Sequence, residues 1–172
     1  VTNMDGASES PPNVTPGIGV ALLNYDNVAH TMRIQASFNS LLGTTTMAHI
    51  HAPTTLPFTS TAGVATQLPS FSGFPLGVTA GAMDTTFDMT LASTWNSSYV
   101  TANGGTTAGA EAAFASHLAQ GKAYFNIHST FDGSGEIRGF FTLLPEPTSL
   151  GLAATSALAL IAVGRRARKP FA

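Results

Sequence analysis

The sequence contains no cysteine and few charged residues, and both shortages narrow the range of functions. Without cysteine, the chain of 172 residues cannot form a disulfide scaffold, a thiolate metal site or a thiol nucleophile. Any metal ligand must therefore come from histidine, methionine or a carboxylate. Charged residues make up only 9% of the chain. Gly, Ser, Thr, Asn and Pro are abundant instead, a balance typical of exported β proteins.

Positive charge is scarce outside the C-terminus. Four of the seven basic residues lie within the last eight positions, which leaves three basic residues for residues 1–164, where all nine acidic residues lie. Nucleic-acid affinity is built from Lys and Arg that neutralise phosphates, so this part of the chain would repel a polyanion. We therefore exclude nucleic acid as a partner.

The C-terminal segment 145–172 has the composition of a sorting and anchor segment. It begins with Pro145-Glu146-Pro147, continues through an apolar stretch and ends in a basic cluster that includes Arg165 and Arg166. The apolar run alone is shorter than the roughly 20 residues of a full bilayer span, although its flanks extend it to 148–164. The basic end is expected to stay in the cytoplasm, which places everything before the Pro-Glu-Pro turn across the membrane.

This arrangement resembles the PEP-CTERM sorting signal of Gram-negative bacteria. The resemblance implies that an exosortase-type enzyme cleaves at the Pro-Glu-Pro site after transient anchoring in the inner membrane through 148–164. The body would then reach the cell surface or an exopolysaccharide matrix. A plain C-terminal anchor is the alternative interpretation. Because the sequence has no initiating Met and no signal peptide, we expect it to begin after a cleaved export signal.

The body shows the period-2 alternation of half-buried antiparallel strands. In one clear case Met32, Ile34 and Phe38 fall on one face. We expect strands at 17–25, 31–38, 45–52, 61–68, 85–92, 123–129 and 136–144, and one short helix at 109–120 that ends at Gly121. The sequence thus predicts a flexible lead-in over 1–16, an all-β domain over 17–144 and an apolar C-terminal helix. The expected architecture is an antiparallel Greek-key β-sandwich or barrel.

Three short segments carry a family resemblance in their order and spacing. They are Ala48-His49-Ile50-His51, Tyr124-Phe125-Asn126-Ile127-His128 and Gly135-Glu136-Ile137-Arg138-Gly139. Over residues 10–144 the chain resembles the CHRD (chordin-type) domain, which implies an extracellular β domain and no defined activity. The His-X-His strand also resembles the copper-binding strand of copper/zinc superoxide dismutases. The bridged zinc site and the Cys pair of that enzyme are missing here, so dismutase activity is not implied.

The histidines His49, His51 and His128 are the candidate site. On a strand, Met47, His49 and His51 share one face, with the two imidazoles about 7 Å apart, and pairing with the strand of His128 would bring in a third ring. Imidazole suits copper and zinc, and a Met47 thioether would favour Cu(I). The alternative is that the three rings form hydrogen bonds to loop backbone and tie the segment 53–69 to the sheet. The sequence favours that alternative, and the metal interpretation stays open beside it.

Other polar residues are expected to have structural roles. His30 and His117 are ordinary in this interpretation, and Glu136 and Arg138 share a strand face that could form a buried ion pair. No nucleophile elbow, phosphate loop, dinucleotide fingerprint or His-Glu-X-X-His motif is present.

We therefore expect an exported, non-enzymatic protein that acts by binding or assembly, with exopolysaccharide or a second copy of the chain as candidate partners. Two alternatives remain open. One is a copper- or zinc-binding protein, with metal-dependent redox activity as a further alternative. The other is a self-assembling surface filament subunit, because exposed edge strands with few charges can polymerise.

Overall fold

The structure is a computed structural model that describes residues 1–144, and these residues form a mostly β fold. The strands are β1 (Thr2–Asp5), β2 (Ile18–Asp26), β3 (Thr31–Asn39), β4 (Thr45–His51), β5 (Gly81–Asp88), β6 (Tyr124–Ser129) and β7 (Ile137–Phe140). The helices are η1 (Ala92–Thr94), α1 (Ser97–Ala102) and α2 (Thr107–Ala119). The segment 145–172, with the predicted sorting motif and apolar helix, lies outside the described residues.

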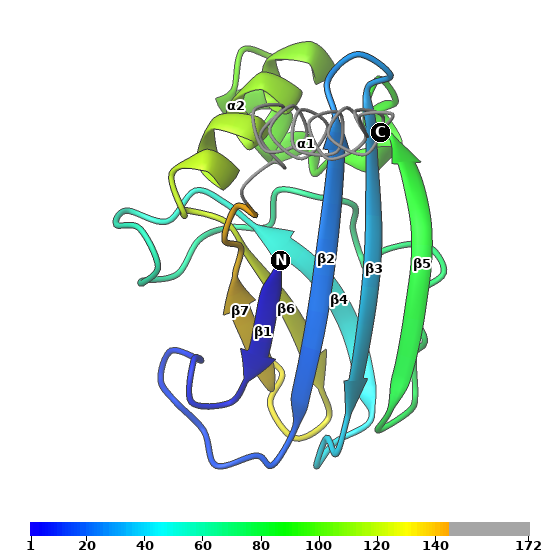
Figure 1. Cartoon of the computed structure of the whole chain (residues 1–172), viewed down its shortest axis with the longest axis vertical. Coiled ribbons are helices and arrows are strands. Elements are labelled where there is room, and N and C mark those ends of the chain that lie inside the picture. Colours follow the sequence, from blue (N-terminus) through cyan, green and yellow to red (C-terminus); the bar gives the residue numbers. More distant parts are fainter. Residues whose placement is uncertain (145–172) are drawn as a thin grey trace, which may run out of the picture.

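All seven strands belong to one antiparallel sheet, in the order β4-β6-β7-β1-β2-β3-β5. The sheet curls into a half-barrel, so that β4 and β6 lie behind the long strands β2 and β3 (Figure 1). The expected antiparallel β fold is thus confirmed. Of the predicted sandwich and barrel, the structure is nearer to the barrel, because the seven strands form one continuous curled sheet and not two separate sheets.

The short strand β1 makes the sheet continuous. It pairs with β2 along its whole length and with β7 through Asp5 and Arg138, so it joins the back strands to the front ones. The prediction that 1–16 is only a flexible lead-in is therefore wrong for Thr2–Asp5. A four-residue strand with one fully apolar side chain, Met4, gives too short an alternation for a sequence pattern to reveal it.

Three other elements differ from the sequence-based expectation. The segment 61–68 forms only isolated bridges, between His51 and Val64 and between Thr66 and Trp95, and is no regular strand. β5 begins earlier than expected and ends at Asp88, after which the chain turns into η1. The helix α1 was not predicted, although Asn96 caps it by accepting a hydrogen bond from the Ser98 N–H.

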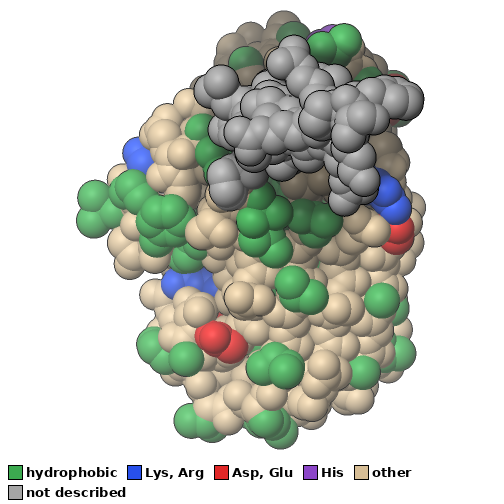
Figure 2. All heavy atoms as spheres, in the orientation of Figure 1, with side chains coloured by type: hydrophobic (Ala, Val, Ile, Leu, Met, Phe, Trp, Pro, Cys, Tyr) green, Lys and Arg blue, Asp and Glu red, His purple; other side chains and the backbone are tan. Residues whose placement is uncertain are grey.

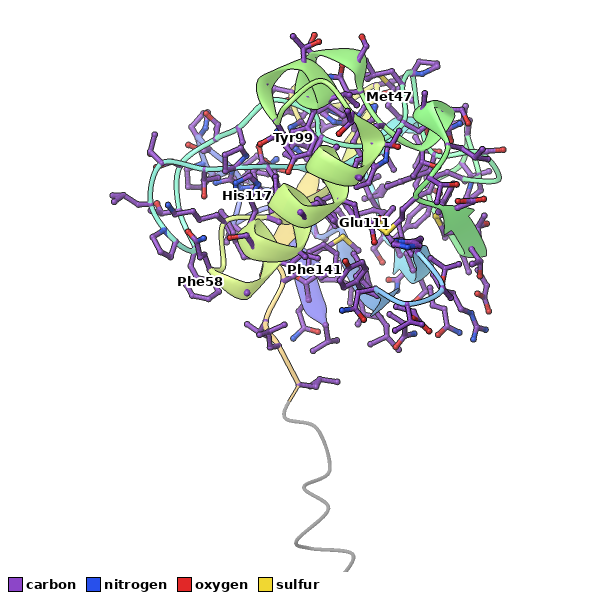
Figure 3. All side chains as sticks on the ribbon, turned by 90° about the horizontal axis from the view of Figure 1, so that it is seen from above. Met47, Phe58, Tyr99, Glu111, His117 and Phe141 are labelled. Atoms are coloured by element: carbon purple, nitrogen blue, oxygen red, sulfur yellow. The ribbon has the colours of Figure 1, made fainter. Side chains whose placement is uncertain are left out.

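The core fills the inside of the curl. Phe71 lies between the front and back strands of the curled sheet. Its ring centroid is 5.2 Å from that of Phe87 on β5 and 5.8 Å from that of Phe125 on β6. The predicted helix is present as α2, which begins after the cap Thr106 and ends before Gly121, whose φ of +66° favours glycine. α2 lies across one end of the sheet (Figure 3) and packs Phe114 against Trp95, with ring centroids 5.5 Å apart.

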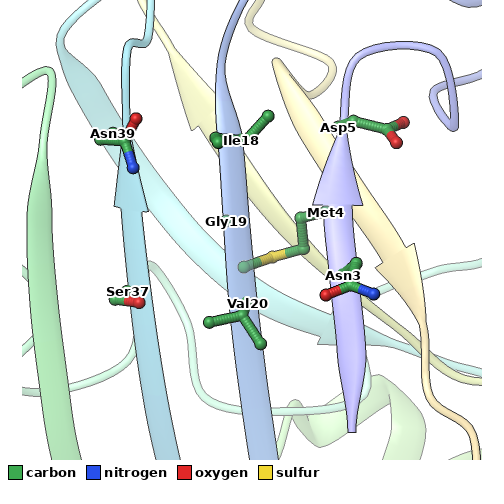
Figure 4. Close-up of a pocket in the computed structure, with 8 residues that line it drawn as sticks. All are labelled: Asn3, Met4, Asp5, Ile18, Gly19, Val20, Ser37 and Asn39. Atoms are coloured by element: carbon green, nitrogen blue, oxygen red, sulfur yellow. The ribbon is translucent and has the colours of Figure 1, made fainter.

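The surface has little charge, and its exposed hydrophobic side chains are scattered among polar ones on the face seen in Figure 2. A shallow hollow crosses β1, β2 and β3 on this sheet (Figure 4). Gly19 lies among its lining residues, and a Cβ there would point to the buried side of the sheet, 2.7 Å from Cε of Met4. No helix within residues 1–144 is long and apolar enough to cross a membrane.

Candidate metal centre

The histidines come together because β4 and β6 pair in antiparallel register. Met47 faces His128, His49 faces Asn126 and His51 faces Tyr124. Directly opposed residues point to the same side of a sheet, so these six side chains form one patch. The alternate residues, such as Ala48 and Ile127, point into the hydrophobic core. The patch therefore lies on the outer side of the back strands.

The patch is nevertheless buried, because loops cover it. The exposed fractions of His49, His51 and His128 are 2%, 8% and 6%. The segment between β4 and β5 supplies the carbonyls of Ala62 and Pro69, and the turn between β6 and β7 supplies that of Gly133. Every residue of β6 is buried, so His128 lies beneath these loops and not on an exposed strand face.

Each imidazole forms a hydrogen bond to one backbone carbonyl, and these bonds fix the tautomers. His49 Nε2 lies 2.6 Å from the Pro69 oxygen, His51 Nδ1 lies 2.9 Å from the Ala62 oxygen, and His128 Nδ1 lies 3.1 Å from the Gly133 oxygen. A carbonyl oxygen can only accept, so the hydrogen of each neutral ring must be on that nitrogen. The other nitrogen of each ring then carries a lone pair and no hydrogen.

The three remaining nitrogens lie close together. His49 Nδ1 is 3.3 Å from His128 Nε2, and His51 Nε2 is buried without a hydrogen-bond partner among the described residues. One ring nitrogen from each residue lies within 4.8 Å of those of the other two. Three nitrogens at about 2.0 Å from one ion are about 3.5 Å apart in a trigonal arrangement, so a small inward shift of the rings would complete the geometry.

Burial disfavours protonation of all three rings. It lowers the pKa of His51 to about 4, and it lowers the pKa of His49 and of His128 below the ordinary value, while the carbonyl partners oppose the shift in each case. The rings are therefore neutral at neutral pH. Neutral imidazole is the form that binds a metal ion.

Arg138 and Tyr124 extend the patch toward β7. The ring of Tyr124 is parallel to that of His51 with centroids 4.9 Å apart, and the Arg138 guanidinium carbon lies 4.9 Å from the Tyr124 centroid. Because β6 lies between β4 and β7, Tyr124 lies between the histidine and the arginine. Arg138 also donates to the carbonyls of Ser8 and Ser60, and so holds two loops over the patch.

The partner of Arg138 is Glu9, whose carboxylate oxygen lies 3.7 Å from the guanidinium nitrogen. The predicted ion pair between Glu136 and Arg138 is therefore wrong. Glu136 precedes β7, and its carboxylate accepts hydrogen bonds from the N–H groups of Leu42 and Gly43 and from two hydroxyls. Glu9 was not predicted at all, because it belongs to the Pro- and Ser-rich segment taken for a lead-in.

Unsatisfied polar atoms concentrate at this patch. Among residues 1–144, the buried side-chain atoms without a hydrogen-bond partner are His51 Nε2, Asn126 Oδ1 and Glu9 Oε1. In the sheet, Asn126 lies opposite His49 of β4 on one side and opposite Arg138 of β7 on the other. Glu9 is beside Arg138. Buried polar atoms are rarely left unpaired in native proteins, so an unexplained group calls for a ligand, ion or water.

The remaining histidines lie elsewhere. His30 forms a hydrogen bond of 2.9 Å to Glu111 of α2, and His117 Nδ1 lies 2.8 Å from the Tyr99 hydroxyl (Figure 3). Met47 is the half-buried cross-strand partner of His128 at the rim of the patch. The loop hydrogen bonds expected from the sequence are present, and the same bonds leave three nitrogens free for an ion.

The CHRD domain family matches the chain over residues 1–141. No curated protein and no solved structure gives a significant match. The matched range covers every strand, including β1, and the whole histidine patch.

Proposed function

The chain belongs to the CHRD domain family, and from this premise we propose that it is an exported binding protein whose His49, His51 and His128 hold one copper or zinc ion. Membership of the family suggests an extracellular binding-type domain. Within that class, the histidine patch is the feature of residues 1–144 that best defines a ligand.

One observation carries the metal proposal: three lone pairs converge with no hydrogen between them. The carbonyls of Pro69, Ala62 and Gly133 take the only ring hydrogens, so nothing donates across the 3.3 Å between His49 and His128. The facing lone pairs therefore repel one another. A cation between the three nitrogens would be attracted to all of them. A proton is a poor candidate because burial lowers the pKa of all three rings.

The carbonyl contacts also suit a metal site for a second reason. Histidines that bind metals commonly donate their other N–H to a carbonyl or carboxylate, which orients the ring and raises its basicity. The hydrogen-bonding and metal interpretations of these histidines are therefore compatible, since one ring nitrogen serves each purpose.

The test is metal analysis of the full chain, purified without chelators and loaded with copper or zinc. We expect about one ion per chain, and we expect His51→Ala to weaken binding by more than about 100-fold, beyond what loss of an outer partner costs. His30→Ala is the matched control, because His30 contacts Glu111 far from the patch. A stoichiometry near zero, or one that His51→Ala leaves unchanged, would refute the metal site.

We further propose export to the cell surface or matrix of a Gram-negative bacterium. An exosortase-type enzyme would recognise Pro145, Glu146 and Pro147 after the segment 148–164 has inserted in the inner membrane with Arg165 and Arg166 on the cytoplasmic side. The lack of cysteine, the low surface charge and the CHRD family membership support this assignment. The binding partner there would be exopolysaccharide or a second copy of the chain.

One observation favours self-assembly as a second candidate function. The edge of β4 is covered, since Ala65 and Phe71 donate to its carbonyls and Thr66 and Ser70 accept from its N–H groups. The edge of β5 has no strand partner within residues 1–144. Negative-stain microscopy of concentrated protein tests this: Lys at the exposed positions Ala82 and Thr86 should abolish any filaments. Filaments that persist in that variant, or none in the unmodified protein, would argue against assembly through β5.

A further inference from the structure

The donor set of the histidine patch is electrically neutral. The outer partners of the three imidazoles are the carbonyls of Ala62, Pro69 and Gly133, and no carboxylate within residues 1–144 hydrogen-bonds to any of the rings. Structural zinc sites reduce the charge of the ion with thiolate ligands, and many catalytic zinc sites do so with a carboxylate ligand, although three neutral histidines and a water also hold zinc. Here an ion would keep its full formal charge.

The charged groups around the patch do not supply the missing negative charge. Arg138 is buried and acts on His51 across the Tyr124 ring, and it adds to the lowering of the His51 pKa. Glu9 is its weak partner at 3.7 Å, and burial raises the pKa of Glu9 to about 7. Asp132 favours the charged form of His128, but it is partly exposed and its carboxylate accepts hydrogen bonds from Ser134. Solvent screens Asp132 more than it screens Arg138.

The cost of burying an ion grows with the square of its charge, so a dication pays about four times the desolvation free energy of a monocation of similar size. Zn(II) also prefers four ligands, so beside the three nitrogens of the patch it would have to bury a water as well. The neighbouring Met47 could add a thioether, which is soft and uncharged and favours Cu(I). We infer that this neutral, buried three-histidine patch selects a soft monovalent ion, Cu(I), over Zn(II). The inference rests on the proposed metal site and specifies its ion.

The first test is a competition on the metal-free full chain under anaerobic conditions, with chelators of known affinity. Cu(I) and Ag(I), a monovalent ion that does not change oxidation state, are compared with Zn(II). We expect one Cu(I) or Ag(I) per chain and Zn(II) affinity weaker by about 100-fold or more. Zn(II) bound as tightly as Cu(I) would overturn the selectivity and leave the metal site intact. If none of the three ions binds, the proposed function itself fails.

The second test addresses the charge of Arg138, which acts twice as strongly on a dication as on a monocation. Arg138→Gln should therefore raise the Zn(II) affinity by about the square of the factor by which it raises the Ag(I) affinity. Arg138→Lys keeps the charge and should leave the ratio of the two affinities near that of the unmodified protein. At pH 6, Glu9 is mostly protonated and does not mask the effect.

Circular dichroism and thermal unfolding check that both variants fold, since Arg138 also bonds to the carbonyls of Ser8 and Ser60. An equal factor for the two ions in a folded Arg138→Gln protein would overturn the electrostatic basis. If that variant does not fold, the competition on the unmodified chain decides the inference alone.

Discussion

At the scale of single residues, the backbone carbonyls determine what the three histidines can do. A hydroxyl or a water can donate or accept, so a ring bonded to it keeps both tautomers available. The carbonyls of Ala62, Pro69 and Gly133 allow one tautomer only. The chemistry of the patch thus depends on which nitrogen of each ring the loops occupy.

This fixed pattern gives a prediction for the metal-free protein at pH 7. Nitrogen-15 NMR should show neutral rings, with the hydrogen on Nε2 of His49 and on Nδ1 of His51 and His128, because each of these atoms donates to a carbonyl. His30, which is half exposed, serves as an internal comparison. Protonated rings at pH 7, or a hydrogen on Nε2 of His51, would contradict the assignment.

Glu9 gives a second prediction at this scale, on stability. Burial raises its pKa from 4.5 to about 7, with Arg138 opposing the shift. Between these two pH values the unfolded chain has lost a proton that the folded chain still holds. The contribution of Glu9 to the free energy of unfolding is therefore complete below pH 4.5 and is lost as the pH rises through 7.

Urea unfolding of the metal-free protein and of Glu9→Gln between pH 4.5 and 8 measures this contribution. The histidines shift the stability the opposite way in both proteins, so the difference between the two isolates Glu9. We expect the difference to change by about 2 kcal/mol, with the unmodified protein losing stability relative to the variant as the pH rises. Parallel curves would show that Glu9 does not titrate in this range.

At the scale of secondary-structure elements, β1 determines the architecture. It is short and partly polar, yet it is the only strand within residues 1–144 that contacts both β7 and β2 in the sheet. Gly139 of β7 allows this approach, since a Cβ there would lie 2.0 Å from the carbonyl oxygen of Asn3. The close contact is between backbones, so a neighbouring side chain cannot move aside to relieve it.

We therefore predict that Gly139→Ala destabilises the protein by about 3 kcal/mol through forced separation of β1 and β7. Gly63→Ala is the matched control, because no atom lies within 4 Å of the added Cβ, and its effect should stay within about 0.5 kcal/mol. Both are measured by thermal and urea unfolding. Equal stability of the two variants would mean that the junction between β1 and β7 is not tight in solution.

At the scale of the whole molecule, we propose separate roles for the body, residues 1–144, and the tail, residues 145–172. The family match and the curled sheet both end close to residue 141. The fold described over residues 1–144 uses the N-terminal and C-terminal strands as neighbours, and Val1 and Thr142 exchange backbone hydrogen bonds. We expect the tail to direct the protein without being part of its fold.

Cell fractionation tests this division in a Gram-negative bacterium that has an exosortase, with an export signal fused ahead of Val1. The full chain should appear, shortened, in the surface or matrix fraction. The chain that ends at Leu144 should be exported but not sorted, and Pro147→Ala should keep its tail and stay in the membrane fraction. A body that remains cytoplasmic with and without the tail would defeat the localisation.

Most strands could be predicted from the sequence because they are long enough to show alternation. β3 buries Met32, Ile34, Ala36 and Phe38 as expected, and α2 has both its cap and its glycine stop. The segment 61–68 has the composition of a strand but lies against β4 and Trp95 as a loop with isolated bridges. Its conformation depends on these neighbours, and local preference alone does not encode them.

By itself, the sequence determined the β class, the absence of thiol chemistry, and the His-X-His spacing that places His49 and His51 on one side of a strand. Only the tertiary structure decided that His128 completes the cluster, that Arg138 pairs with Glu9, and that one short strand joins the layers into a single sheet. The reason is that periodicity fixes which way a side chain points within its own strand. Register, curling and loop closure fix what it meets, and these depend on residues far away in the chain.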